Sequence, residues 1–204
     1  MRLFNLGLPK SGTTTLQAAL TRSGLKAAHW TAQKTTRFGR KKTEFYVGQS
    51  IYSNYLLGRD PLFDLKHFDA ITQADVIMPP FSLWPQMDMA LLAQIRHHHP
   101  DCLFILLKRN PEKVADSIKR WYDMQDRFSA LGAPGLLPQK AASFDGMVAW
   151  INGHYKDMNG TFGQTAQYLE LDIEDDDAPD QLGKALGITI KWWGRENVNQ
   201  PTAL

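Results

Sequence analysis

Short apolar runs alternate with amphipathic segments along most of the chain. Leu3, Phe4, Leu6 and Leu8 predict a buried strand, and the apolar positions 16, 19 and 20 recur with the spacing of one helix face. Further strands are expected within 27–30, 68–78, 103–107 and 168–173, and further helices near 91–95 and over 110–122, 144–160 and 179–186. This alternation predicts an α/β protein with three layers, α/β/α, around a central parallel sheet.

Individual segments add detail to this outline. The continuous run 103–107 is of the kind that parallel sheets bury on both faces, and 68–78 is expected to contain a central strand that Pro79-Pro80 ends. The helix after Asn110 is expected to bury a stripe of four side chains: Val114, Ile118, Trp121 and Tyr122. The stretch 45–57 fits either a pocket wall or simple packing.

Composition narrows the class of protein. A chain of 204 residues is expected to form one domain over 1–204, and a net charge of +2 gives no reason to expect a nucleic-acid partner. The sequence contains no apolar run long enough for a membrane helix, and its first residues lack the pattern of a secretory signal, so a cytoplasmic location is expected. Cys102 is expected to be a buried thiol, and the basic segment 34–42 either a solvated loop or a cover over an anionic ligand.

The turn between the first strand and the first helix has the residues of a phosphate-binding loop. Gly7 and Gly12 permit a backbone that curls with its N–H groups inward, and the following helix adds the positive end of its dipole. The usual nucleotide loop, G-x-x-x-x-G-K-[ST], has its lysine after the second glycine, whereas here Lys10 lies inside the loop. A P-loop type of nucleotide-binding fold with an altered phosphate loop is therefore expected.

Two segments carry a resemblance to a known family. Residues 8–14, LPKSGTT, resemble the 5′-phosphosulfate loop of sulfotransferases that use 3′-phosphoadenosine 5′-phosphosulfate (PAPS). Residues 109–117, RNPEKVADS, resemble the 3′-phosphate signature of the same family, with Arg109 and Ser117 eight positions apart. The tail 192–199 resembles the ending of many bacterial sulfotransferase-like chains but departs from the third motif of the cytosolic enzymes. Trp192 or Trp193 is a candidate adenine-stacking residue, since Thr15 stands where cytosolic members often carry tryptophan.

The resemblance implies a PAPS-dependent sulfotransferase that forms the desulfated product PAP. Its acceptor would be a hydroxyl or amine of an unidentified small molecule or glycan, and no metal is demanded. Lys10 would stabilise charge on the bridging oxygen as the sulfur–oxygen bond breaks. The donor is expected to be bound by Pro9, Lys10, Ser11, Gly12, Thr13, Thr14, Arg109 and Ser117.

The base and the exact activity stay open at this point. His29, His67, Asp69 and Asp75 are candidates for the general base, and Asp75 is favoured because it lies near the end of a predicted central strand. A P-loop kinase, with Asp172 as a magnesium ligand, is the first alternative; a nucleotide-binding protein without transfer chemistry is the second. The strongest strand ends in Lys108-Arg109 where a kinase often has an acid, which favours the sulfotransferase. The oligomeric state is undetermined.

Overall fold

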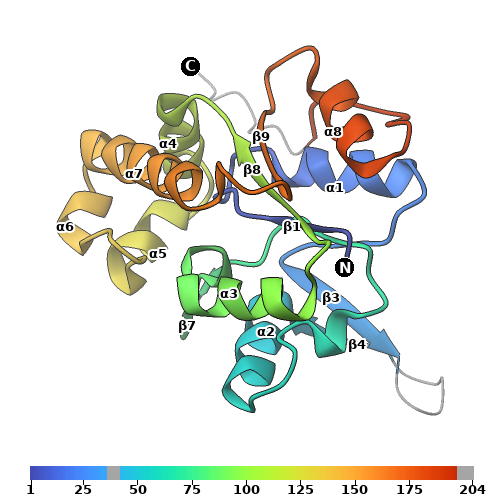
Figure 1. The fold of residues 1–204 in the computed structure, drawn as a ribbon. Coiled ribbons are helices and arrows are strands. Elements are labelled where there is room, and N and C mark those ends of the chain that lie inside the picture. Colours follow the sequence, from blue (N-terminus) through green and yellow to red (C-terminus); the bar gives the residue numbers. More distant parts are fainter. Residues whose placement is uncertain (36–41, 197–204) are drawn as a thin grey trace.

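The computed structural model describes residues 1–35 and 42–196. At its centre lies a five-stranded sheet in the order β2-β5-β1-β8-β9, with every neighbouring pair parallel (Figure 1). Phe4 in β1 pairs with Ile71 in β5 on one side and with Phe104 in β8 on the other. The strands of this sheet are β1 Leu3–Asn5, β2 Ala27–Ala28, β5 Ala70–Ile71, β8 Leu103–Lys108 and β9 Tyr168–Asp172.

Helices cover both faces of the sheet, which confirms the predicted α/β class. Successive residues of β8 point to opposite faces: Phe104 and Leu106 join the core against α2, α3, α4 and α7, while Ile105 and Leu107 join the core against α1 and α8. The helices are α1 Thr13–Arg22, α2 Val47–Leu56, α3 Met89–His98, α4 Pro111–Lys119, α5 Met124–Leu131, α6 Pro138–Ala141, α7 Phe144–Phe162 and α8 Ala178–Leu186, with short 3-10 turns at Phe63–Leu65 and Pro85–Met87. No helix in the described part of the chain has the length and apolar character that crossing a membrane requires.

Two antiparallel hairpins lie outside the sheet, and one of them contains part of the segment that was predicted as a central strand. The segment 68–78 is not one central strand, because only Ala70–Ile71 enters the sheet. Val76–Met78 forms β6, which pairs with β7 (Phe81–Leu83), and Pro79-Pro80 makes the turn between them. The other hairpin pairs β3 (Thr31–Thr35) with β4 (Lys42–Tyr46), and most of the basic segment 34–42 lies outside the described residues.

The stripe expected after Asn110 is only half correct. Helix α4 buries Val114 and Ile118 but ends at Lys119, so Trp121 and Tyr122 follow the helix instead of continuing it. Tyr122 has a positive φ of 44° and is 88% exposed. Within the stretch 45–57, residues of α2 pack into the core, and Cys102 is buried as expected.

The loop from β1 to α1 lies tightly against neighbouring strands. Gly12 has a φ of 106°, and a Cβ at this position would come within 2.6 Å of Ile173 Cγ1, just beyond β9. Gly7 approaches β8 so closely that a Cβ would lie 2.6 Å from the Leu107 carbonyl oxygen. Glycine is therefore required at both positions by contact, and at Gly12 by the backbone conformation as well.

We predict that Gly12→Ala destabilises the fold more than Gly24→Ala. Both glycines have positive φ, so each alanine costs about 1–2 kcal/mol of backbone strain. Only Gly12 adds a steric clash, worth about 1–3 kcal/mol, because nothing lies within 4 Å of a Cβ at Gly24. Urea unfolding of the two variants measures the difference, and equal losses would contradict the tight packing of the loop.

Candidate active site

A single cavity of about 1000 Å³ lies over the carboxyl ends of the sheet strands. Ligands of open parallel sheets bind at this edge, beside the point where the strand order reverses. The cavity brings together the two segments that the sequence singled out, 8–14 and 109–117. The predicted site residues that line it are Pro9, Lys10, Gly12, Thr13, Thr14, His29, Asp75, Arg109 and Ser117.

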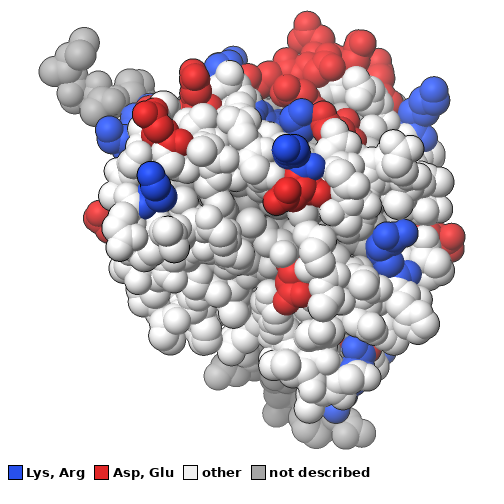
Figure 2. Space-filling view, turned by 60° about the vertical axis from the view of Figure 1, so that its left-hand side comes forward, with Lys and Arg blue, Asp and Glu red and all other residues white. Residues whose placement is uncertain are grey.

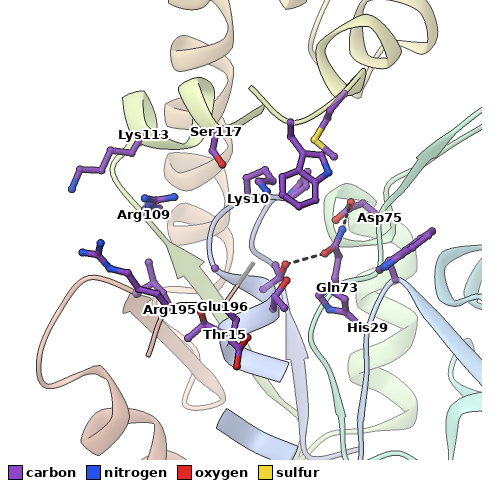
Figure 3. A pocket seen from close by; sticks show the side chains of 18 of the residues that line it. Lys10, Thr15, His29, Gln73, Asp75, Arg109, Lys113, Ser117, Arg195 and Glu196 are labelled. Carbon is purple, nitrogen blue, oxygen red and sulfur yellow. Dashed lines mark hydrogen bonds between the residues drawn. The ribbon is translucent and has the colours of Figure 1, made fainter. Parts of the chain in front are cut away.

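The order of the strands sets the order of the side chains across the cavity. His29 follows β2, Asp75 follows β5, Lys10 follows β1 and Arg109 follows β8. Figure 3 shows the result: Arg109, Lys113, Ser117 and Arg195 lie toward one end, His29, Gln73 and Asp75 toward the other, and Lys10 between them. The cavity thus has a cationic end and an end with a buried carboxyl group.

The charged side chains at the site are confined to a small part of the surface. On the face shown in Figure 2, side chains of both signs gather toward one end, and a large part of the face carries no charge. Among the residues that line the cavity, Arg109 and Lys113 pair with Glu174, and Arg120 pairs with Asp116. These basic side chains therefore line the cavity, and the face in Figure 2 carries no broad basic surface.

Lys10 is held in an unusual environment. Its backbone has a positive φ of 68°, and its ammonium lies 3.3 Å from the centre of the Trp121 ring. Burial, followed by repulsion from Arg109 and Arg120, lowers the pKa of Lys10 to about 8. Lys10 is therefore a cation at neutral pH, but one that an anionic ligand would stabilise strongly.

The remaining loop residues divide into two groups. Ser11 is fully buried and forms its hydrogen bonds within the loop. Both its hydroxyl (2.7 Å) and its N–H (3.2 Å) donate to the Leu8 carbonyl oxygen. Helix α1 begins at Thr13 with no side-chain cap from the described residues, and Gly12, Thr13 and Thr14 line the cavity at this helix start. The Thr13 hydroxyl donates to Gln73 Oε1 at 2.9 Å, and its predicted part in phosphate binding stays a prediction.

At the cationic end, a carboxylate of the chain holds the basic side chains. Glu174 accepts hydrogen bonds from Arg109 Nε at 3.3 Å and from Lys113 Nζ at 2.8 and 3.0 Å. Partial burial raises the pKa of Glu174, but the hydrogen bonds from Lys113 and Arg109 outweigh this and lower it below its usual value. Ser117 is buried on α4 beside this group. The arrangement places a carboxylate of the protein itself between Arg109 and Lys113.

At the opposite end, Asp75 is a buried carboxyl group held by two amides. It is 2% exposed and accepts from Gln73 Nε2 at 2.9 Å and from Gln86 Nε2 at 3.0 Å. Burial raises the pKa of Asp75 to about 7, although both amide bonds act in the opposite direction. A carboxylate with this pKa is well matched to removing a proton near neutral pH.

His29 is a weaker base than Asp75. Its Nδ1 lies 3.0 Å from Thr72 Oγ1, and the Thr72 hydroxyl donates its own hydrogen to the Ala28 carbonyl oxygen. His29 Nδ1 must therefore carry the proton, which leaves Nε2 as an acceptor. Burial lowers the pKa of His29 to about 4, so the ring is neutral.

Other candidates fall outside the cavity or take different roles. His67 and Asp69 do not line it, and Asp69 Oδ2 instead accepts from the Lys26 N–H at 2.8 Å. Trp193 lines the cavity, whereas the Trp192 ring lies under the Arg22 guanidinium at 4.0 Å. Thr15 also lines it, and its Oγ1 accepts from the Glu196 N–H at 3.4 Å.

Sequence reasoning missed four residues of the site. Gln73 lies two residues after β5, and the sequence, which predicted a strand within 68–78, gave no signal that the strand ends at Ile71. Trp121 was expected in the core of a helix that ends before it. Lys113 and Glu174 meet only because α4 follows β8 and Glu174 follows the adjacent β9, a neighbourhood that no local pattern contains.

Comparison with known proteins agrees with the geometry. A family model described as "Sulfotransferase domain" matches residues 2–175, which include the loop 8–14, Asp75 and the segment 109–117. No curated protein matches the chain. The match covers most of the sequence, and the chain belongs to the sulfotransferase domain family.

Proposed function

We propose that this protein transfers the sulfuryl group of PAPS to a hydroxyl or amine group of an acceptor. The observation that carries the proposal is that one cavity is lined both by the loop 8–14 and by Arg109 and Ser117. The donor is an adenosine with phosphate groups at two ends, so it needs two separate anion sites that face one space. The proposal is supported because both segments line the same cavity, and Lys10 lies between Arg109 and Asp75.

The donor is assigned to the cationic end. Backbone amides at Gly12, Thr13 and Thr14, with the Thr14 hydroxyl, would hold the 5′-phosphate at the start of α1. Arg109 and Ser117 would hold the 3′-phosphate, and the Glu174 carboxylate now bonded to Arg109 would yield to it. Trp193, which lines the cavity, is the stronger candidate for contact with adenine.

The transfer needs a leaving-group stabiliser and a base. The acceptor oxygen or nitrogen attacks the sulfur atom, the bond from sulfur to the bridging oxygen breaks, and that oxygen leaves with the electron pair on the phosphate of PAP. The Lys10 ammonium would stabilise the charge that builds on this oxygen. Asp75, ionised before the reaction, would take the proton that the acceptor loses.

The end of the cavity near Asp75 supports an acceptor with an apolar framework. Its wall includes Trp30, which is 39% exposed, and half-buried Met78 and Met124. Two further apolar residues, Val76 and Ile77, complete it. Aromatic and thioether groups of this kind bind flat apolar molecules well, with the reacting hydroxyl or amine directed to the carboxyl group.

The same geometry counts against the kinase alternative. Asp172, the acid that would hold magnesium, does not line the cavity, and its Oδ1 accepts from the Glu174 N–H at 2.9 Å. Strand β8 delivers cations to the site where a magnesium-dependent enzyme needs an acid.

The non-catalytic alternative is tested by transfer of labelled sulfate from PAPS to a panel of phenols, alcohols, amines and glycans.

We predict that the protein binds PAP at least about ten-fold more tightly than ATP with magnesium. Arg109→Ala is expected to weaken PAP binding by about 10–100-fold, since a hydrogen bond to a charged group contributes about 1.5–3 kcal/mol. Calorimetry measures both effects. The control is Arg59→Ala, an exposed arginine that does not line the cavity. Tighter binding of ATP would favour the kinase and contradict the proposal.

We predict that Lys10→Met lowers turnover far more than donor affinity. Methionine keeps an apolar stem beside Trp121 but removes the ammonium, so kcat should fall by about 10²–10³. The affinity for PAP should change by only a few-fold, because the amides and Arg109 remain. Labelled-sulfate transfer to the best acceptor of the panel gives kcat, and calorimetry gives the Kd of PAP.

A matched control exists on the surface. Lys66 lies 4.9 Å from the centre of the Phe63 ring and is exposed, so Lys66→Met removes a similar contact outside the cavity. It should leave both quantities unchanged. If Lys10→Met weakened PAP binding as much as it lowered kcat, Lys10 would be a binding residue only.

We predict a narrow bell-shaped dependence of kcat/KM on pH. Activity should fall below about pH 7, where Asp75 gains a proton, and above about pH 8, where Lys10 loses one. Asp75→Asn should remove most of the activity and abolish the acidic limb of the residual rate. Rates measured between roughly pH 5 and 10, a range that covers both limbs of the profile, provide the test. An unchanged acidic limb in Asp75→Asn would exclude Asp75 as the base.

A further inference from the structure

Gln73 connects the phosphate loop to the candidate base. Its amide oxygen accepts from the Thr13 hydroxyl at 2.9 Å, and its amide nitrogen donates to Asp75 Oδ2 at 2.9 Å. Figure 3 shows this chain of hydrogen bonds running from the start of α1 to the carboxyl group. Gln73 is half-buried and lines the cavity between these two partners.

The direction of the chain is fixed by its chemistry. An ionised carboxylate only accepts hydrogen bonds, so the NH₂ group of Gln73 must face Asp75, and its oxygen must face Thr13. A threonine hydroxyl has one hydrogen, and Thr13 gives it to Gln73. Turning the Gln73 amide would place its oxygen against a carboxylate oxygen, and the hydrogen bond to Asp75 would be lost.

We propose that Gln73 is a positioning residue that fixes Asp75 relative to the phosphate loop through Thr13. This inference rests on the proposed function, in which Asp75 is the base. It also assigns the Thr13 hydroxyl to the base, so that the 5′-phosphate would be held by the backbone amides and the Thr14 hydroxyl. Carboxyl group and donor loop are thereby kept in one geometry, as reaction between an acceptor and a bound donor requires.

Gln86 supports the same carboxyl group differently. It donates to Asp75 Oδ1 at 3.0 Å, but it is fully buried, does not line the cavity and has no bond to the loop. Gln86 therefore holds Asp75 from the core side, on the 3-10 turn Pro85–Met87. Among the residues that the structure describes, Gln73 alone joins Asp75 by side-chain hydrogen bonds to the segment that the donor would contact.

Titratable side chains of several described elements line the cavity together with Asp75. Lys10 comes from the loop after β1, His29 from the segment between β2 and β3, and Arg127 from α5, where it pairs with Asp123. Gln86, which donates to Asp75 Oδ1, does not titrate. Replacing Gln73 leaves all of these side chains in place, so a change in the titration of Asp75 is attributable to the lost amide.

The experiment measures the titration of Asp75 directly. Protein labelled with ¹³C at the aspartate carboxyl carbons is titrated by NMR, and Asp75→Asn assigns the resonance. We expect Gln73→Met to raise the pKa of Asp75 by about one unit, because a donor to the ionised form is lost. Thr13→Val should act in the same direction, and it should add nothing in the Gln73→Met background. The acidic limb of kcat/KM should move with the NMR value.

Controls separate this inference from the proposed function. Gln125→Met removes another glutamine that bonds elsewhere, to the Ala142 carbonyl oxygen, and should leave Asp75 unchanged. An unaltered Asp75 titration in Gln73→Met overturns the positioning role while PAP binding and sulfate transfer leave the proposed function intact. Failure of the wild-type protein to bind PAP overturns the function independently of the NMR result. Should Gln73→Met fail to fold, Thr13→Val applies the same test, and no shift there also overturns the role.

Discussion

The site depends on one constraint, the position of β1 between β5 and β8 in a parallel sheet. Parallel strands end at a common edge, with neighbours about 4.8 Å apart, so residues that follow them form a row. Asp75, Lys10 and Arg109 stand in that row although long stretches of chain separate them. The loop after β1 must therefore lie between a carboxyl group and a guanidinium, whatever the rest of the fold does.

Burial changes the pKa values of the titratable groups in this row. Removing a group from water disfavours its charged form, which lowers the pKa of a lysine and raises that of a carboxyl group. The pKa of Lys10 is thereby lowered to about 8, and the pKa of Asp75 is raised to about 7. Burial thus acts on both groups within one cavity, and repulsion from Arg109 and Arg120 adds to its effect on Lys10.

The sequence predicted those features whose physical cause is local. The phosphate loop needs glycines, a lysine and a helix start within a few residues, and the segment 109–117 places Arg109 and Ser117 on one strand end and the helix after it, so both were recognisable. The split of 68–78 into a sheet strand and a hairpin strand was not, because both halves have similar β-branched patterns and only pairing partners distinguish them. Gln73 and Glu174 acquire their roles through strands adjacent in space, which periodicity cannot reveal.

Three side chains that line the cavity already have partners within the protein. The Lys10 ammonium lies on Trp121, Glu174 holds Arg109, and Gln73 accepts from the Thr13 hydroxyl. Binding a phosphorylated ligand would therefore exchange hydrogen bonds and ion pairs for better ones, and its affinity would reflect the difference between the two sets. These partners also keep the cationic side chains in place, so less conformational freedom is lost on binding. The Gln73 bond differs from the other two, because its far end is the carboxyl group that would receive the proton. Retaining that bond would keep the carboxyl group aligned with the loop while the other two partners were exchanged.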